Sequence, residues 1–406
     1  MKKHLKPRRT IVLFKQFYWL ILIMALSIVS CKKEIAPDPG SDESLSADEL
    51  SVGDVSSVND EETALRRHIP HVVVHHGHSI QAAVNRAKPG SIIFIEPGIY
   101  NEAILVSKPC IQLVGLKDKR GEHKEIIIQN PGDEEYGIKV TDEGDGFILK
   151  NVIVRNFEEY GVYLVKVDNF VLDHVKSINN KEYGLFPVFC NNGVIKYCSA
   201  TGSSDTGIYV GQSTNIIVRF NVAFGNVSGF EIENCSNVSA SWNESFNNTA
   251  GMLVFLLPEL TVKSSSNILV TKNNIHHNNL DNFAPPDGGL ETNIPPGSGM
   301  LILGADNVTI RQNTITNNNF VGIATVSTLI LHVLGVPDPP GGYTDIEPNP
   351  DGTKIVHNVV NHNGSAPPPG LPLPGADLLW DGSGTNNCWS YNIFTSSYPP
   401  NLPACN

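Results

Sequence analysis

The stretch Gly-Ile-Tyr-Val-Gly-Gln-Ser-Thr-Asn-Ile-Ile-Val (Gly207–Val218) is followed, 22 residues later, by Gly-Phe-Glu-Ile-Glu-Asn-Cys-Ser-Asn-Val-Ser-Ala (Gly229–Ala240). In both, a glycine opens a short apolar run and an asparagine stands eight residues after the glycine. This pattern returns every 22 to 24 residues between Gly161 and Gly322, which indicates stacked structural repeats. The other Gly–Asn pairs are Gly161/Asn169, Gly184/Asn192 and Gly299/Asn307, and Gly251/Asn267 joins them if Pro258–Ser265 is an insertion.

Each repeat is too short to hold two helices and a turn, and its apolar runs are short and β-branched. Such runs, bounded by Gly and Asn, are typical of short strands. Two or three strands per turn, stacked on one another, predict an all-β fold, a single-stranded parallel β-helix. Asparagine suits the tight turn repeated in every coil, and its side chains can bond one another along the stack. A second column reads Asn221, Asn243, Asn273 and Asn313, with Cys198 in the same slot.

Alternation along each strand predicts which side chains point inward. Counted from the repeat glycine, positions +1 and +3 are mostly apolar, so we expect them in the core and positions +2 and +4 in solvent. The inward pairs are Val162/Leu164, Ile208/Val210, Phe230/Ile232, Met252/Val254 and Met300/Ile302.

The start of the chain's ordered part resembles that of the right-handed parallel β-helix proteins of the pectate-lyase-like group. Ser79–Ala87, then Ile92–Ile95 and Pro97–Tyr100, is similar to their N-terminal capping helix and first coil, and Ser79 is a suitable helix N-cap. The resemblance covers roughly Ile69–Asn392 and implies a β-helix domain at 68–392 with a tail at 393–406. The group includes lyases, hydrolases, epimerases and non-catalytic surface proteins, so the resemblance implies a fold and no single activity. Ser204–Ser213 is also similar to a signature of bacterial β-helix proteins.

The N-terminal region resembles a bacterial lipoprotein signal. Residues 1–30 carry six Lys or Arg and no acid, and an apolar run ends just before Cys31, which would be the lipidated residue. A plain signal peptide has the same regions, and the run is too short for a membrane span. Lys32 favours the outer membrane by analogy. Between Glu34 and Glu62 the chain holds ten acids and no Lys or Arg, which indicates that 31–67 is a disordered acidic tether.

Six cysteines remain beyond Cys31. Cys190 and Cys235 occupy the same slot two coils apart, about 9.6 Å, which is too far for a disulfide. With Cys198 and Cys110 they are expected to be small buried residues. Cys388 and Cys405 lie in the irregular C-terminal end and are the pair expected to form a disulfide.

Candidate catalytic residues come from the outward positions of neighbouring coils. Glu231 and Glu233 are two apart on one strand, so they share a face roughly 6.5 Å apart at the backbone. Apolar neighbours and mutual repulsion would raise the pKa of one and leave the other ionised, as an acid/base pair requires. Asp205, just before the preceding strand, is the third candidate. The alternative is that these are solvated surface acids on an acid-rich chain.

Candidate substrate-binding residues surround these acids. Aromatic side chains offer stacking surfaces for a saccharide, and the loops Pro258–Ser265 and Asn279–Ser298 are placed to wall the patch. No Lys or Arg occupies an outward position beside the acid pair, so Arg219, on the next strand, would neutralise a uronate only if the coil bends it toward the same groove. The substrate-binding candidates are Tyr209, Gln212, Phe186, Phe255 and Arg219.

No protein-bound metal site of known spacing is evident, although the carboxylates offer a Ca²⁺ site. His76 and His78, in the run His68–His78, would share a strand face and bind a metal; scattered histidines before the domain are the alternative.

The formal net charge of −12 argues against nucleic acid as a partner. We therefore expect a monomeric, lipid-anchored protein of the cell envelope. It would bind or process a polysaccharide, such as one that contains uronate, on the exposed strand face. If it is an enzyme, it would be a lyase, an epimerase or a glycoside hydrolase. The alternative is a non-catalytic surface or adhesion scaffold.

Overall fold

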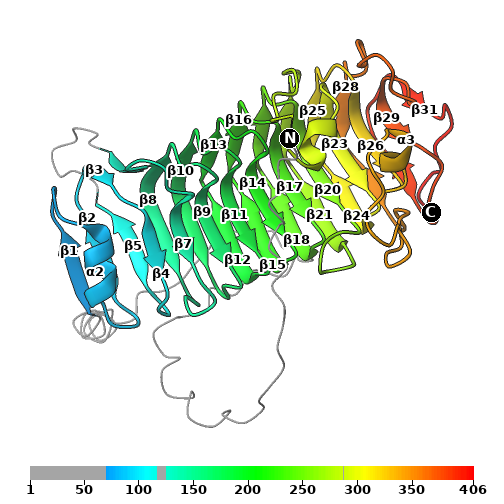
Figure 1. Cartoon of the computed structure of the whole chain (residues 1–406). Coiled ribbons are helices and arrows are strands. Elements are labelled where there is room, and N and C mark those ends of the chain that lie inside the picture. Colours follow the sequence, from blue (N-terminus) through cyan, green and yellow to red (C-terminus); the bar gives the residue numbers. More distant parts are fainter. Residues whose placement is uncertain (1–69, 117–124, 287) are drawn as a thin grey trace, which may run out of the picture. The chain divides into compact units, whose positions relative to one another are not determined.

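The computed structural model describes residues 70–116, 125–286 and 288–406, and there the chain winds into a right-handed parallel β-helix (Figure 1). The predicted all-β solenoid is confirmed. The predicted signal peptide (1–30), the lipidation residue Cys31, the acidic segment (31–67) and His68 lie outside the described residues.

Among the described residues, eleven strands form one continuous parallel sheet, called sheet B here. It receives one strand from each coil, so neighbouring strands are one repeat apart in sequence. In chain order its strands are β4 (Ile104–Val106), β7 (Tyr136–Val140), β9 (Tyr160–Val165), β11 (Tyr183–Val188), β14 (Thr206–Gly211), β17 (Ser228–Glu233), β20 (Ala250–Phe255), β23 (Ser298–Leu303), β26 (Val321–Val326), β29 (Ala376–Trp380) and β31 (Ser397–Tyr398).

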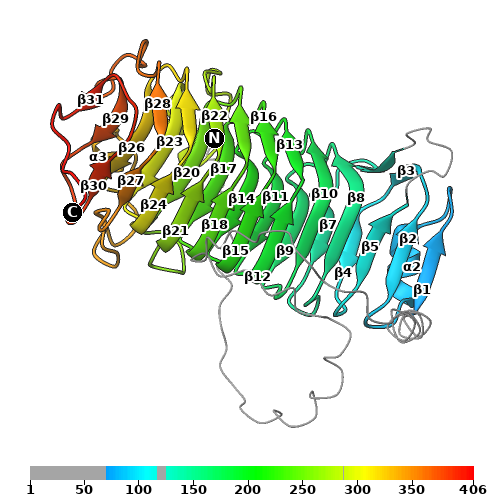
Figure 2. The same ribbon diagram turned by 180° about the vertical axis from the view of Figure 1, so that it is seen from behind.

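The remaining described strands form sheet A, which contains two parallel ladders that share β8 and β10. Figure 2 shows the molecule from behind. A central coil therefore has three strands, as in β14, β15 and β16. The first ladder is β1 (His71–Val74), β2 (Ile92–Ile95), β5 (Gln112–Gly115), β8 (Ile148–Arg155), β10 (Val171–Ile178), β12 (Asn191–Lys196), β15 (Thr214–Arg219), β18 (Ser236–Ser241), β21 (Ser266–Thr271), β24 (Asp306–Arg311), β27 (Lys354–Val356) and β30 (Cys388–Ser390). The second adds β3 (Gly98–Asn101), β6 (Ile126–Gln129), β13 (Ser199–Thr201), β16 (Val222–Phe224), β19 (Glu244–Phe246), β22 (Asn274–His276), β25 (Thr314–Thr316) and β28 (Val359–Asn361).

The core fills the inside of the coils, as the alternation predicts. Ile208 and Val210 on β14 stack on Phe230 and Ile232 on β17, and all four are buried. Every inward pair named above belongs to this one apolar cluster. Each coil thus buries its apolar side chains against its neighbours, which lets a solenoid grow beyond the size of a single globular core.

Asparagine side chains connect the coils. The first predicted column is exposed and left-handed, for example Asn215 with φ 59° and Asn237 with φ 56°, and Asn237 Nδ2 donates to Asn215 Oδ1 at 3.2 Å. The second predicted column is buried: Asn243 Nδ2 donates to Asn273 Oδ1 at 3.0 Å. A third column was not predicted. In it each asparagine Nδ2 donates to the Oδ1 of the asparagine on the next coil, in the order Asn226, Asn248, Asn278, Asn318 and Asn363.

The N-terminal end is closed by α2 (Ile80–Arg86), whose N-cap is Ser79 as predicted; its hydroxyl accepts from the Ala82 N–H at 3.0 Å. His76 and His78 do not share a strand face, because β1 ends at Val74 and both lie in the turn that follows.

The cysteines divide as follows. Cys190, Cys198 and Cys235 are buried and free. A disulfide joins Cys388 to Cys405. Cys110 was expected to be buried but is half-buried, because it occupies a left-handed turn (φ 57°) outside the strands, and it is not one of the free cysteines.

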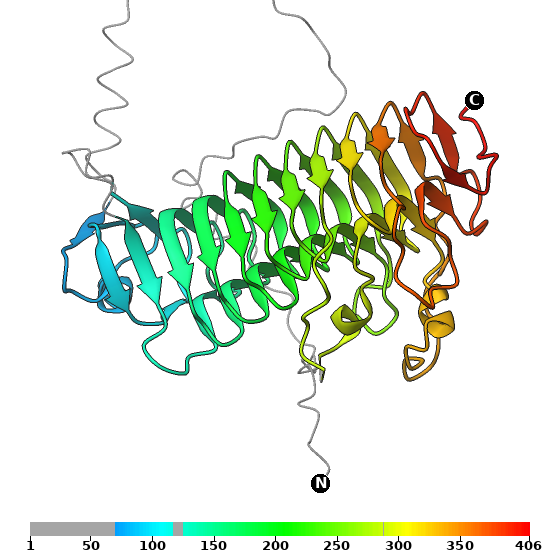
Figure 3. The same ribbon diagram turned by 90° about the horizontal axis from the view of Figure 1, so that it is seen from above.

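The outward positions of sheet B are not all in solvent, which corrects the prediction for the C-terminal coils. Chain segments that project on one side of the solenoid there (Figure 3) fold back over sheet B and bury its outer face. Leu253, Phe255 and Leu303 are at most 3% exposed and belong to a second apolar cluster. Leu257, Ile294 and Leu331 join that cluster from the covering segments, which include η2 (Leu290–Asn293) and α3 (Ile330–Val333).

Candidate functional site

Two carboxyl groups project from β17 on the outer face of sheet B. The register places Glu231 between Tyr209 and Leu253, and Glu233 between Gly211 and Phe255, the neighbours that the repeat predicts. Both were expected in solvent, but Glu231 is 7% exposed and Glu233 is 4% exposed. The physical reason is the cover over the following coils, whose Glu291 is near enough to act electrostatically on Glu231.

Hydrogen bonds hold both carboxyl groups to the preceding coil. Thr206 Oγ1 lies within hydrogen-bond distance of two carboxyl oxygens, 2.7 Å from Glu231 Oε2 and 3.0 Å from Asp205 Oδ1. The Tyr209 hydroxyl donates to Glu233 Oε2. Asp205 is itself 7% exposed. The structure therefore brings the three predicted catalytic residues into one buried cluster, the acid cluster Asp205, Glu231 and Glu233, although it does not present them on an open surface.

Burial is the main cause of the electrostatic state of this cluster. The pKa of Glu231 is raised well above its ordinary value, first by burial and then by the negative charges of Glu233 and Asp205. The pKa of Tyr209 is also raised, by burial and by Glu233, so its hydroxyl keeps its proton. A protonated Glu231 beside further carboxyl groups is the environment of an acid/base pair.

Aromatic side chains extend from the acid cluster toward the N-terminal coils on the same face. Tyr209 stacks on Phe186 at 4.4 Å between ring centroids, and Phe186 lies 4.3 Å from Tyr183 and 5.0 Å from Tyr160. Tyr160 stacks on Tyr163 at 4.8 Å. We call Tyr160, Tyr163, Tyr183, Phe186 and Tyr209 the aromatic track.

A cation stands at the far end of this track. Lys139 on β7 lies over the rings of Tyr136 and Tyr163, at 4.9 and 5.4 Å from their centroids. From β7 to β17 there are four coil steps, roughly 19 Å. One face of sheet B thus carries, in order, an ammonium group, a row of aromatic rings and the acid cluster. Three of the rings are half-buried, those of Tyr160, Tyr163 and Phe186, whereas Tyr183 and Tyr209 are buried.

Three predicted substrate-binding residues have other surroundings than expected. Gln212 holds a loop: its Oε1 accepts from the N–H groups of Thr261 and Val262 at 2.8 and 3.0 Å. Phe255 is buried under the cover. Arg219 lies on β15 in sheet A, so the coil does not bend it toward the acid cluster. Tyr209 and Phe186 belong to the track.

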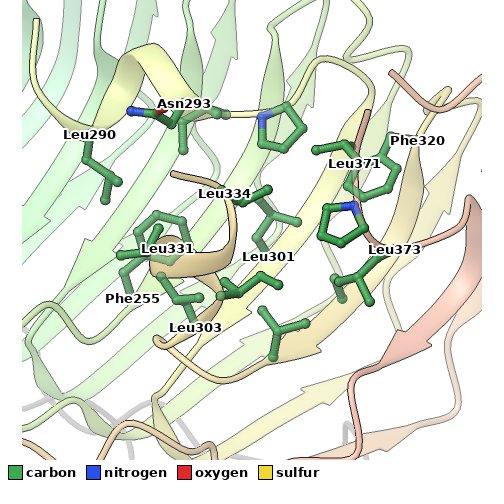
Figure 4. Close-up of a pocket in the computed structure, with 16 residues that line it drawn as sticks. Phe255, Leu290, Asn293, Leu301, Leu303, Phe320, Leu331, Leu334, Leu371 and Leu373 are labelled. Atoms are coloured by element: carbon green, nitrogen blue, oxygen red, sulfur yellow. The ribbon is translucent and has the colours of Figure 1, made fainter. Parts of the chain in front are cut away.

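The cover encloses an apolar pocket of about 70 Å³ beside the acid cluster (Figure 4). Its floor is the outer face of β20, β23 and β26, and its walls come from residues 290–295, 330–334 and 371–373. Phe255 is one of the floor residues and is also the register partner of Glu233. Residues 290–295 of the insertion Asn279–Ser298, which was expected to wall the acid patch, line this pocket, together with two further segments that the sequence did not assign to a wall.

Sequence reasoning missed Thr206, Lys139 and the tyrosines that precede the repeat glycines. The signal was present: Tyr136, Tyr160 and Tyr183 each stand one position before a repeat glycine, and Thr206 takes that slot in the next coil. At this position, tyrosine rings on three successive coils give way to the Thr206 hydroxyl on the coil that precedes Glu231 and Glu233.

Two further findings concern metals and membranes. Within residues 70–116, 125–286 and 288–406, no three His, Cys, Asp or Glu side chains cluster as a metal site. In the same ranges no helix has the length and hydropathy needed to cross a membrane.

Comparisons with known proteins agree with the fold. Residues 122–256 and 257–335 match the family described as the right handed beta helix region. The A-modules of two mannuronan C-5 epimerases of Azotobacter vinelandii, AlgE6 and AlgE4, are similar in structure: both are 16% identical, with TM-scores of 0.55 and 0.53. Each match covers 78% of this chain, and 83% or 94% of the epimerase module. A lacto-N-biosidase of Eubacterium ramulus is 12% identical with a TM-score of 0.50, over 82% of this chain and 69% of the other. No curated protein sequence matches the chain.

Proposed function

Because the chain belongs to the right-handed β-helix family, we propose that it binds an extended polysaccharide along the outer face of sheet B and processes that chain at the acid cluster. The observation that carries this proposal is the continuity of the aromatic track with Glu231 through the stacked pair Phe186 and Tyr209. The half-buried rings of Tyr160, Tyr163 and Phe186, on two successive coils, offer apolar surfaces to a sugar chain.

The proposed chemistry is general acid/base catalysis. Glu231, whose pKa is raised well above its ordinary value by burial and by the neighbouring carboxyl groups, is the proposed acid. It gives its proton to the leaving glycosidic oxygen in hydrolysis and β-elimination, or back to C5 in epimerisation. The base is a second carboxyl group of the cluster, Glu233 or Asp205. In hydrolysis it takes a proton from the water that adds to the anomeric carbon, and in β-elimination or epimerisation it takes the hydrogen from C5 of the uronate. Hydrolysis, β-elimination and epimerisation all use an acid and a base, and they differ in the atom from which the base removes a proton.

A uronate-containing polymer is the substrate class we propose. Lys139 at the end of the track supplies a positive charge over aromatic rings, a site suited to a sugar carboxylate. Two of the structurally similar proteins are named as mannuronan epimerases, which supports the choice of polymers to test. Ca²⁺, for which the carboxylates offer a site, is included as a variable in that test.

A second candidate function is non-catalytic recognition of the same polymer. The observation that favours it is the low exposure of Glu231 and Glu233, because a sugar reaches them only if the covering segments move. The two candidates share the aromatic track and differ in whether bonds are broken.

The deciding experiment screens alginate, polygalacturonate and neutral polymers with and without Ca²⁺. New unsaturated ends indicate a lyase, new reducing ends a hydrolase, and exchange of the sugar C5 hydrogen an epimerase. Glu231→Gln should lower turnover by at least about a hundredfold and leave binding unchanged. Glu244→Gln, an acid on β19 in sheet A, is the matched control. Binding without turnover supports recognition. Both candidates are contradicted if the wild type binds none of the polymers, or if Tyr163→Ala binds them as tightly as the wild type does.

We also propose that Cys31 anchors the protein to the outer membrane as a lipoprotein. The support is the sequence of residues 1–31. Metabolic labelling with a palmitate analogue should mark the wild-type protein and not Cys31→Ser, and the labelled protein should fractionate with outer membranes. Equal labelling of both proteins would contradict the anchor.

A further inference from the structure

The apolar pocket beside the acid cluster is assigned no role above. Of the sixteen residues that line it, only Asn293 is polar, and its side chain is exposed at the rim, where it donates to Thr292 Oγ1. The deeper lining is leucine, isoleucine, valine, alanine, proline and phenylalanine. A space with this lining has no partners to hold a water molecule by several hydrogen bonds, so it favours an apolar occupant.

The pocket opens to the surface. Leu301 on the floor and Leu290, Leu334 and Leu371 on the walls are half-buried, whereas Leu303 and Phe320 are buried. A ligand group can therefore enter from solvent without separating the buried residues. The volume of about 70 Å³ is smaller than an engineered cavity that takes benzene, about 150 Å³, and it suits a group of two to four heavy atoms.

The pocket also adjoins the proposed reaction site. Phe255 lines it and is the register partner of Glu233, and Leu303 is the partner of Phe255 one coil further. The pocket floor thus begins at Phe255, one coil step or roughly 5 Å from the acid cluster, and extends to β26, three coil steps away. A substituent on a sugar held at the cluster reaches the near edge of this floor.

We infer that the pocket is a subsite for a short, uncharged acyl substituent of the polysaccharide, such as an O-acetyl group; this rests on the proposed function. A neutral ester presents a methyl group to the apolar floor and its carbonyl to the rim at Asn293. A free carboxylate is excluded, because burying a charge against apolar atoms without a partner is strongly unfavourable. The enzyme then prefers acylated stretches of its polymer over bare uronate stretches.

The test uses pairs of polymers that differ only in acetylation: acetylated alginate against the same material after alkaline deacetylation, and acetylated pectin treated likewise. For the full-length wild type, the acetylated member of one pair should bind about tenfold more tightly, the usual effect of one small apolar group in a fitted pocket. Ala324→Phe, which fills the pocket from β26, should reduce this ratio to about one without weakening binding of the deacetylated polymer. Ala324→Leu should be intermediate. Leu329→Phe, an exposed position next to α3 that does not line the pocket, is the control.

Xenon provides a second readout that needs no polymer. Crystals of the wild type under xenon pressure should show a bound atom in the pocket, and crystals of Ala324→Phe should not. Equal binding of acetylated and deacetylated polymer, or a pocket that xenon does not enter, overturns the subsite while the proposed function stands. Failure of every polymer to bind, with xenon bound, overturns the proposed function and the acyl assignment with it.

Discussion

Thr206 on β14 and Glu231 on β17 are joined across neighbouring coils by a hydrogen bond of 2.7 Å. The same Thr206 oxygen lies 3.0 Å from a carboxyl oxygen of Asp205. A hydroxyl has one proton and donates to only one of them. Both contacts are satisfied if Glu231 is protonated and donates to Thr206, which then donates to Asp205. The geometry and the raised pKa of Glu231 therefore point to the same protonation state.

The first prediction follows from that pKa. Between about pH 4.5 and the raised folded-state value, Glu231 is ionised in the unfolded chain and protonated in the folded one, so the folded state binds more protons there. The free energy of unfolding should therefore fall as pH rises through this window, by about 1.4 kcal/mol per pH unit for this one group. Glu231→Gln should lack this loss and become more stable than wild type as pH rises, measured by urea unfolding at pH 5, 6 and 7. A pH dependence identical in both proteins would mean that Glu231 is ionised when folded.

The second prediction concerns the tyrosine that holds the other carboxyl group. Tyr209→Phe removes a hydroxyl that donates to Glu233 in a buried site. The loss of one donor to a buried carboxyl group should lower the free energy of unfolding by about 1–3 kcal/mol. Tyr163→Phe, on the half-buried part of the same track, should change it by less than about 0.5 kcal/mol. Comparable losses for both variants would show that the Tyr209 bond adds nothing.

The repeat made the register of this site predictable, because a parallel ladder at constant period has only one alignment. The neighbours of Glu231 and Glu233 on β14 and β20, and the inward side chains, follow from counting along the strand. The helix cap at Ser79 is equally local. These features depend on residues one coil apart or closer.

Exposure was not predictable, because it depends on where long insertions fold. Nothing in the composition of Asn279–Ser298 states that it packs over sheet B rather than away from it, yet its Ile294 covers the face that holds Phe255. The position of Arg219 depends on where each coil turns from sheet B into sheet A, because Arg219 lies on the strand after that turn. Thr206 was missed because its role needs the side-chain position of Glu231 in the next coil.

The third prediction tests the buried asparagine column. Asn273 accepts from the backbone and side chain of Asn243 and donates to Ala240 and Asn313, all within 3.0 Å. Asn273→Ala leaves buried groups on the two neighbouring coils without these bonds, so it should cost at least about 3 kcal/mol in unfolding free energy.

The control for this substitution is the exposed column. Asn237→Gly keeps the left-handed turn (φ 56°) and loses one exposed bond to Asn215, so its effect should stay within about 1 kcal/mol. Chemical unfolding of both variants makes the comparison. Equal costs would refute the view that the buried column carries the stability.

The last prediction concerns the loop that Gln212 holds beside the acid cluster. Its Oε1 accepts from Thr261 and Val262 at 2.8 and 3.0 Å, and Asn234 Nδ2 bonds the carbonyls of Leu257 and Val262 in the same loop. Gln212→Ala removes two of these bonds, so the loop should open more often while the coils stay folded. Tryptic cleavage after the exposed Lys263 should become roughly thirtyfold faster, since each of the two bonds contributes about 1 kcal/mol.

Gln312→Ala is the matched control. Gln312 has φ 56° and Gln212 has φ 50°, so alanine meets the same left-handed backbone cost at both positions. Gln312 lies in the turn after β24 in sheet A, on a different part of the coil. Faster cleavage in both variants would assign the effect to backbone strain. Faster cleavage in Gln212→Ala alone would show that this side chain holds the loop against the coil.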